Sequence, residues 1–131
     1  MVAIPEGYES LLERPLYGHL ATVRPDGAPP QVNAMWFSWD GELLRFTHTT
    51  KRQKYRNITA NPAVAMSIID PDNPPYRYLE VRGVVEEIVP DPTGSFYLEL
   101  NDRYDGPLTE PPADKADRVI LVVRPTAFSK Q

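Results

Sequence analysis

The chain has 131 residues, of which 41% are hydrophobic and 24% charged, a composition typical of one folded domain. Its net charge of −4 argues against a nucleic-acid-binding protein, and the absence of cysteine excludes disulfides and thiolate metal sites. No run approaches the roughly 18 apolar residues of a membrane-spanning helix, and residues 1–13 lack the pattern of a signal peptide. We therefore expect residues 1–131 to form a single cytoplasmic domain, with neither nucleic acid nor membrane as a partner.

The predicted elements begin with a short helix near the N-terminus, followed mostly by strands. Runs rich in β-branched and aromatic residues are separated by proline and glycine turns, of which Asp26-Gly27 and Asp40-Gly41 favour hairpins. Gly83, inside the fifth strand, predicts a bulge or a close backbone approach. The expected strands are 17–24, 31–39, 42–49, 63–69, 76–89 and 118–124.

Two more helices are expected between the strands. Residues 50–61 begin with a capping box in which Thr50 is the N-cap and Gln53 the third helical residue. Residues 93–104 follow Asp91-Pro92, a pair typical of an N-cap and the first position of a helix. Six antiparallel strands with short peripheral helices predict a mainly β (α+β) fold, either a barrel or a sandwich.

The basic segment Lys51–Arg56 is unusual for an acidic chain because it holds four cations and no acid. Lys51, Arg52 and Lys54 would lie in the first helical turn, where the helix dipole disfavours positive charge. A bound phosphate or carboxylate would resolve this conflict, since free backbone N–H groups and cations would meet it together. Four cations on a short helix are also typical of a solvated surface, so the charge pattern by itself leaves both interpretations open.

Other chemistry-bearing residues give weaker signals. His48 ends a strand beside the basic segment and has the chemistry to bind a ligand, although strand-end histidines are more often exposed polar residues. His19 is interpreted as structural, and no metal is expected, because two histidines without clustered carboxylates make a poor site. Glu86 and Glu87 point to opposite faces of a strand, so they cannot act as a catalytic pair.

Two motifs carry a resemblance to a known family. The pattern L-A-T-V-x-x-D-G-x-P occupies 20–29, and R-x-K-x-x-N-I-x-x-N-P-x-V-A occupies 52–65. Together they resemble the split-barrel flavin- and deazaflavin-binding proteins, relatives of pyridoxamine 5'-phosphate oxidase that use coenzyme F-420 or FMN. The resemblance extends from about Gly18 to Val89. It implies a six-stranded antiparallel split β-barrel that works as a homodimer, with cofactor sites at the subunit interface.

The same resemblance implies roles for particular residues. Arg52 and Lys54 match the phosphate-binding pair of the family, and Trp36 lies on the strand beside the flavin-type ring. Tyr76 and Tyr78 match aromatic residues that the other subunit often supplies. The full set of expected cofactor-binding residues is Gln31, Val32, Asn33, Trp36, Thr47, His48, Thr49, Thr50, Arg52, Lys54, Asn57, Tyr76 and Tyr78.

The implied function is an oxidoreductase in which the cofactor carries the redox chemistry and the protein binds and orients it. Hydride transfer to a small unsaturated or cyclic substrate is expected. True pyridoxamine phosphate oxidases carry a C-terminal Arg-x-His element, which this sequence lacks, so pyridoxamine phosphate is not the expected substrate. The motifs favour F-420 over FMN. The alternatives are an FMN-binding oxidoreductase and a non-catalytic flavin or F-420 carrier.

Overall fold

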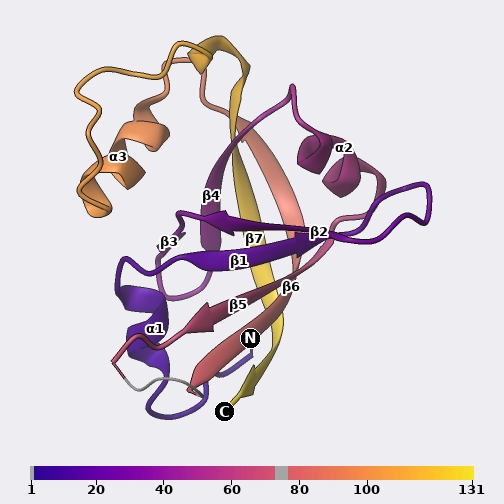
Figure 1. Ribbon diagram of the computed structural model, residues 1–131, viewed down its shortest axis with the longest axis vertical. Coiled ribbons are helices and arrows are strands. Elements are labelled where there is room, and N and C mark those ends of the chain that lie inside the picture. The colour runs from indigo at the N-terminus through magenta and orange to yellow at the C-terminus, as the bar shows by residue number, and fades with distance from the viewer. Residues whose placement is uncertain (1, 73–76) are drawn as a thin grey trace.

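The computed structural model describes residues 2–72 and 77–131 and shows one antiparallel sheet of seven strands that curls into a split barrel (Figure 1). Its strand order is β2-β1-β5-β6-β7-β4-β3. The strands are β1 (Gly18–Thr22), β2 (Gln31–Met35), β3 (Ser38–Trp39), β4 (Leu44–Thr49), β5 (Ala63–Ile69), β6 (Tyr78–Pro90) and β7 (Arg118–Lys130). The helices are α1 (Glu9–Glu13), α2 (Gln53–Ala60), α3 (Ser95–Arg103) and the 3-10 turn η1 (Lys115–Asp117). The expected mainly β split barrel with short peripheral helices is confirmed, with seven strands in place of six.

The extra strand arises because the predicted strand 31–39 is divided, so that part of the prediction was wrong. β2 pairs with β1 at one edge of the sheet, whereas β3 pairs with β4 at the other edge. Trp36 and Phe37 cross between the edges, and Phe37 is fully buried. Side chains replace the strand ladder there: the Phe37 N–H donates to Tyr104 Oη at 3.0 Å, and its carbonyl accepts from Arg103 Nε at 3.0 Å.

The long strands β6 and β7 form the central pair, and their pairing shifts register between Arg82 and Gly83. A Cβ on Gly83 would lie 2.7 Å from the carbonyl oxygen of Arg124, closer than real Cβ atoms approach such a group. This confirms the bulge and close approach predicted for Gly83. The last strand runs to Lys130 rather than to residue 124. Pro125 lacks an N–H, but it lies opposite Gly83 at the bulge, so the strand continues past it.

The core lies inside the curl and is built from alternate residues of the strands together with α1 and Ile58 of α2. Leu11 and Leu12 of α1 are fully buried, which explains why a helix of five residues persists. The largest fully buried side chains are Phe37, Phe46, Leu11, Leu12, Leu20, Leu44, Ile68, Leu79, Leu100, Leu121, Val81 and Val123.

The predicted capping box at Thr50 is wrong. α2 begins at Gln53, its N-cap is Arg52 in extended conformation, and no side chain caps it. Thr50 instead lies in the turn that follows β4, where its N–H donates to the carbonyl oxygen of Asp117 at 3.1 Å. Lys51 and Arg52 therefore precede the helix, and only Lys54 of the three cations lies in its first turn.

The start of α3 also differs from the prediction, because the helix begins at Ser95 after Gly94 in the left-handed region, with a φ of 69°. Asp91 is therefore not the N-cap residue. Its buried carboxylate nevertheless accepts hydrogen bonds from the Phe96 N–H at 3.1 Å and the Ser95 hydroxyl at 3.2 Å. Asp91 thus accepts hydrogen bonds from the first turn of α3, although it lies three residues before the N-cap Gly94.

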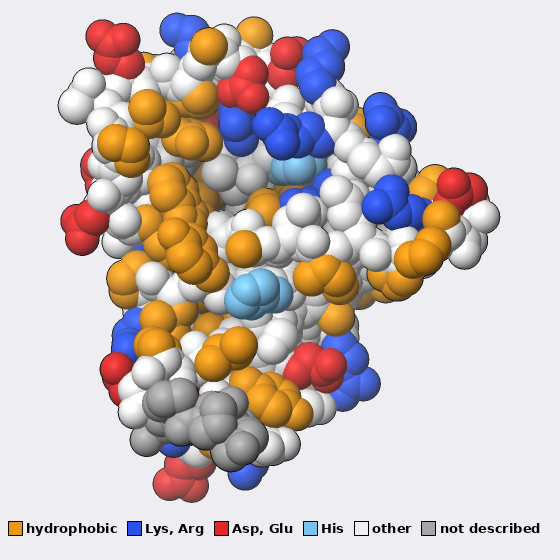
Figure 2. All heavy atoms as spheres, in the orientation of Figure 1, with side chains coloured by type: hydrophobic (Ala, Val, Ile, Leu, Met, Phe, Trp, Pro, Cys, Tyr) orange, Lys and Arg blue, Asp and Glu red, His pale blue; other side chains and the backbone are white. Residues whose placement is uncertain are grey.

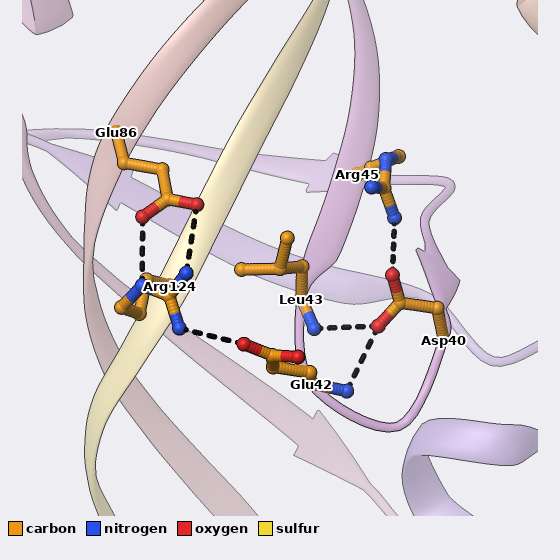
Figure 3. A network of polar contacts seen from close by, with 6 residues as sticks. All are labelled: Asp40, Glu42, Leu43, Arg45, Glu86 and Arg124. Atoms are coloured by element: carbon orange, nitrogen blue, oxygen red, sulfur yellow. Dashed lines mark hydrogen bonds and ion pairs between the residues drawn. The ribbon is translucent and has the colours of Figure 1, made fainter. Parts of the chain in front are cut away.

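A polar network fixes the turn between β3 and β4 against the central strands (Figure 3). Asp40 accepts from Arg45 at 2.6 Å and from two backbone N–H groups of the turn, and these bonds lower the pKa of its carboxyl to about 2. Arg124 of β7 donates to both carboxylate oxygens of Glu86 and to Glu42. Within residues 2–72 and 77–131, no helix is long and apolar enough to cross a membrane.

Candidate functional site

A polar pocket of about 290 Å³ opens where β2, β4, β7 and the start of α2 meet. Figure 2 shows Lys and Arg side chains gathered around a hollow on this face of the molecule. We call it the β4–α2 pocket. Its lining residues are Gln31, Asn33, Ala34, Met35, Thr47, His48, Thr49, Arg52, Lys54 and Arg118. The fold therefore brings together most of the site residues that the sequence predicted.

Three of these side chains hold buried polar atoms with no hydrogen-bond partner among the described residues. They are Asn33 Oδ1, Thr47 Oγ1 and His48 Nε2. Buried polar atoms in proteins are nearly always hydrogen-bonded, since leaving one unpaired costs about 1–3 kcal/mol. Their concentration around one pocket indicates a site for a ligand with several hydrogen-bonding groups.

Lys54 is a buried cation whose side chain has no acidic partner among the described residues. It is only 4% exposed, and its Nζ lies 2.9 Å from the sulfur of Met35. Burial, together with the positive charge of Arg52, lowers the pKa of Lys54 to about 8. A buried charge without a counterion is costly, so this arrangement favours an anion in the pocket.

His48 lies at the same pocket and is 6% exposed. Burial, followed by the charges of Lys54, Arg118 and Arg52, lowers the pKa of His48 to about 3. The imidazole is therefore neutral near pH 7. A neutral imidazole donates one hydrogen bond and accepts another, so His48 can orient a polar ligand without adding charge.

Sulfate binding to this pocket is expected to weaken as the pH rises above about 8, because Lys54 then loses the proton that makes it an anion ligand. Sulfate itself keeps its charge over this range. Titration calorimetry should give a roughly constant affinity below about pH 7.5 and a loss on the order of tenfold by about pH 9. In Lys54→Met the pH dependence should disappear; a slope of the same size in that variant would contradict the assignment.

The two arginines of the pocket differ in their partners. Arg52 is exposed and makes no side-chain hydrogen bond or ion pair within the described part of the chain, so it is available to a ligand. Arg118 donates to both oxygens of Asp114, at 3.0 and 3.2 Å, and its guanidinium lies 4.7 Å from the ring centre of Tyr97. Sequence reasoning missed Arg118, because only the pairing of Arg118 with Thr49 across β4 and β7 brings it to the pocket.

Asn57 lies behind the pocket rather than on its surface, and it is completely buried. Its amide nitrogen donates to Thr22 Oγ1 at 3.0 Å and to Gln31 Oε1 at 3.2 Å, while its oxygen accepts from Gln53 at 2.9 Å. The geometry gives Asn57 a positioning contact with Gln31, which does line the pocket.

Three other predicted residues, Val32, Thr50 and Tyr78, do not line the pocket. Val32 is 60% exposed and points away from it, since strand alternation places it opposite Gln31 and Asn33. Tyr78 starts β6, a strand that contributes no lining residue to the pocket, and Tyr76 falls outside the described residues. Thr50 is engaged through its backbone, as described above. In the described ranges no group of three or more His, Asp or Glu side chains could hold a metal ion.

Trp36 borders a second, smaller cleft beside the pocket. This aromatic cleft has a volume of about 200 Å³. Its lining residues are Tyr17, Ala34, Met35, Trp36, Thr47 and Tyr97, three of which (Ala34, Met35 and Thr47) also line the β4–α2 pocket. Sequence reasoning did not identify Tyr97, because α3 reaches the strand edge only in the folded chain.

Comparisons with known proteins agree with this architecture. A solved structure named F-420 reductase is 90% identical, covers 98% of this chain and 100% of its own, and superposes with a TM-score of 0.94. Conserved hypothetical protein Rv2991 from Mycobacterium tuberculosis is 24% identical, with a TM-score of 0.72 and coverage of 98% of this chain and 84% of that one. General Stress Protein 26 from Bacillus anthracis is 22% identical, with a TM-score of 0.69 and coverage of 93% and 88%.

These two distant structures share the fold, whereas no curated protein matches the chain. The family model described as pyridoxamine 5'-phosphate oxidase matches residues 4–131. Because that match covers nearly the whole sequence, the chain belongs to the pyridoxamine 5'-phosphate oxidase family.

Proposed function

We propose that this protein is an oxidoreductase that uses the deazaflavin coenzyme F-420 to reduce a small unsaturated or cyclic substrate. The observation that carries the proposal is Lys54, a buried ammonium without a carboxylate partner among the described residues, facing the same pocket as Arg52. Two cations at the entrance to a helix suit a phosphate group. Family membership and the 90% identical structure named F-420 reductase support a flavin-type cofactor.

The donor set of the pocket fits such a cofactor. Arg52 and Lys54 would hold the phosphate, one as a planar fork and the other as a point charge. The unpaired atoms of Asn33, Thr47 and His48 would meet the polar groups of the sugar-like chain and ring. His48 is neutral near pH 7, so it would orient the cofactor through hydrogen bonds, while the positive charges that hold the phosphate come from Arg52 and Lys54.

When bound, the cofactor supplies the hydride, and the protein contributes binding, orientation and exclusion of water. Asn57 would keep Gln31 in place at the pocket wall through their 3.2 Å hydrogen bond. Met35 lines both the β4–α2 pocket and the aromatic cleft, so it would contact ligands bound in either. The pH at which the pocket loses an anchoring charge is set by Lys54.

FMN carries a phosphate as well, so the cationic pair alone does not separate the two cofactors. The name of the 90% identical structure favours F-420. The test is a titration of the purified protein with reduced F-420, followed by fluorescence, beside a titration with FMN. Micromolar binding of F-420 with turnover on a panel of enones and quinones is the expected result. Binding without turnover would favour a carrier, and uptake of FMN alone would favour a flavoprotein.

We further propose that two copies pair through the outer face of β1, β5 and β6, with the cofactor sites at their interface. Antiparallel sheets usually present polar residues to solvent, but here Ala63 and Ala65 of β5 line a shallow apolar hollow. Val23 and Val84, which also line this hollow, are 42% and 38% exposed. An apolar patch of this kind is typical of an association surface.

Val84→Glu is expected to convert the dimer into a monomer, because it would bury a charge in the interface. Light scattering coupled to gel filtration measures the mass directly. Val2→Glu, which changes a residue 37% exposed outside this face, is the matched control and should leave the mass unchanged. A native protein that is monomeric at micromolar concentration would contradict the pairing.

A further inference from the structure

Four aromatic rings gather beside the β4–α2 pocket, and three of them are nearly parallel. The Trp36 and Tyr104 rings lie 5.2 Å apart at 13°, and those of Tyr17 and Tyr104 lie 6.0 Å apart at 16°. Tyr97 is the fourth, at 6.1 Å from Trp36 and tilted by 53°. Offset-stacked and tilted pairs at these distances are mutually attractive. The aromatic cleft therefore has ordered walls.

Tyr97 owes its position to a chain of contacts that begins in another part of the sheet. The Arg118 guanidinium lies over its ring at 4.7 Å, and the carboxylate of Asp114 holds that guanidinium with two hydrogen bonds. The Arg118 side chain is only 12% exposed, so the contact is largely shielded from water. A cation–π contact of this kind strengthens when it is desolvated. Tyr97 is thus held as a wall of the cleft and is half-buried.

The size and continuity of the aromatic cleft indicate what it accepts. Drug-sized ligands occupy pockets of about 300–1,000 Å³, so a cleft of about 200 Å³ suits one ring system rather than a whole cofactor. It shares Ala34, Met35 and Thr47 with the β4–α2 pocket. A ring in the cleft would therefore lie next to a ligand in the pocket.

We propose that the aromatic cleft binds the planar conjugated ring of the substrate and that Tyr97 determines specificity for such rings. The proposal rests on the function proposed above, because the adjacent pocket would hold the reduced cofactor. In the reaction the reduced cofactor would supply the hydride, with one of its C–H bonds breaking as the hydride forms a new bond in the substrate. The cofactor would release one proton to water and the substrate would take up one proton from water, so that the cofactor is oxidised and the substrate reduced by two electrons. Trp36 and Tyr97 would favour flat rings over puckered ones, because only a flat ring contacts an aromatic wall along its full face.

The first test needs no cofactor, because the chain has only two tryptophans, Trp36 and Trp39. In Trp39→Phe all indole emission comes from Trp36, and in Trp36→Phe all of it comes from Trp39. We expect menadione, a planar two-ring quinone, to quench the emission of Trp39→Phe with saturation and that of Trp36→Phe only weakly and linearly. Equal quenching of the two variants would overturn the proposal.

The second test introduces Tyr97→Ala and Tyr97→Phe into the Trp39→Phe protein. Loss of the ring is expected to raise the apparent Kd for menadione about three- to tenfold, the fold-change of one aromatic pair, and Phe should restore it. Leu98→Ala, which changes a neighbouring half-buried residue of α3 outside the cleft, is the matched control. An unchanged Kd in Tyr97→Ala, or an equal rise in Leu98→Ala, would overturn the role of Tyr97.

The third test compares turnover of menadione and 2-cyclohexenone by the protein loaded with reduced F-420. In Tyr97→Ala the KM for menadione should rise at least three times as much as the KM for the puckered enone, with a smaller change in kcat. Equal effects on both substrates would count against ring selection. If the quenching results hold but neither compound is reduced, the cleft still binds flat rings and the proposed reductase function is wrong.

Discussion

Replacing Lys54 with methionine is expected to weaken cofactor binding by roughly ten- to a hundredfold. The substitution removes one charge-assisted contact to the phosphate, which contributes about 1.5–3 kcal/mol. Methionine fills a similar volume beside Met35, so the shape of the pocket should persist. Fluorescence titration of F-420 measures the loss. Arg52→Ala should weaken binding in the same range, since Arg52 supplies the second anchoring charge.

The same Lys54→Met substitution, although it weakens cofactor binding, is expected to stabilise the folded protein at pH 7. In the folded protein Lys54 has a pKa of about 8, against 10.5 for an ordinary lysine. The unfolded chain therefore binds more protons between these values, so the native free energy of unfolding should rise as the pH increases from about 8 to 10.5. At pH 7 the buried ammonium costs up to about 3 kcal/mol, and methionine removes that cost.

Denaturant unfolding at pH 7 and pH 10 tests both effects, the stabilisation by methionine at pH 7 and the rise in native stability with pH. The free energy of unfolding of the native protein, compared with that of Lys54→Met at the same pH, should be higher at pH 10 than at pH 7. Lys51→Met is the matched control, because Lys51 is exposed and lies in the same basic segment. It should change stability by less than about 0.5 kcal/mol and binding by only a few-fold. A Lys54→Met protein that is both less stable and unchanged in affinity would remove the basis for the anion site.

Arg103→Met is expected to destabilise the protein by about 2–4 kcal/mol and lower its Tm by about 10 °C. Arg103 Nε donates to the backbone carbonyl of Phe37 at 3.0 Å. Its terminal nitrogens donate to the backbone carbonyls of Glu13 at 3.2 Å and Arg14 at 2.9 Å. A further bond reaches Leu12 at 3.4 Å. One guanidinium thus joins α3 to the end of α1 and to the segment that crosses between the sheet edges.

The physical reason for this loss of stability is that three of these carbonyls, those of Leu12, Glu13 and Arg14, lie at the C-terminal end of α1. The last carbonyls of a helix lack intrahelical donors and carry partial negative charge, so a cation there satisfies them and matches the dipole. Methionine keeps most of the aliphatic stem and removes only the donors. Arg24→Met is the control, because the half-buried Arg24 side chain donates to one carbonyl only, that of Pro29. Thermal unfolding of both variants measures the contrast, and equal Tm values would contradict the role of Arg103.

Much of the architecture could be predicted from the sequence because its causes are local. Proline and glycine turns separate short β-rich runs, and Asp26-Gly27 and Asp40-Gly41 do form turns, with Gly27 and Gly41 at positive φ. The pattern also predicted the bulge at Gly83 and a second helix over 50–61, which the structure shows over Gln53–Ala60. The two motifs, at 20–29 and 52–65, by themselves carry the resemblance to the split-barrel fold.

The errors arose where distant side chains replaced local signals. Strand 31–39 looked continuous, yet Tyr104 and Arg103 bind the backbone of Phe37 and hold the chain as it crosses from one edge to the other. Thr50 matched a capping box, but its N–H donates to the carbonyl of Asp117, and the helix begins only at Gln53. In both places a partner more than 60 residues away outweighed a preference of neighbouring residues.

The basic segment and the strand end before it were determined by the sequence alone, since charge and residue type there are local properties. Only the tertiary structure decided that Lys54 is buried while Lys51 and Arg52 are exposed, because burial depends on the packing of α2 beside β2. The pairing of β4 with β7 likewise brought Arg118 to the pocket, and Arg118 and α3 brought Tyr97 to the cleft. Sequence fixes which side chains can bind an anion or a ring, whereas long-range strand register decides which of them meet.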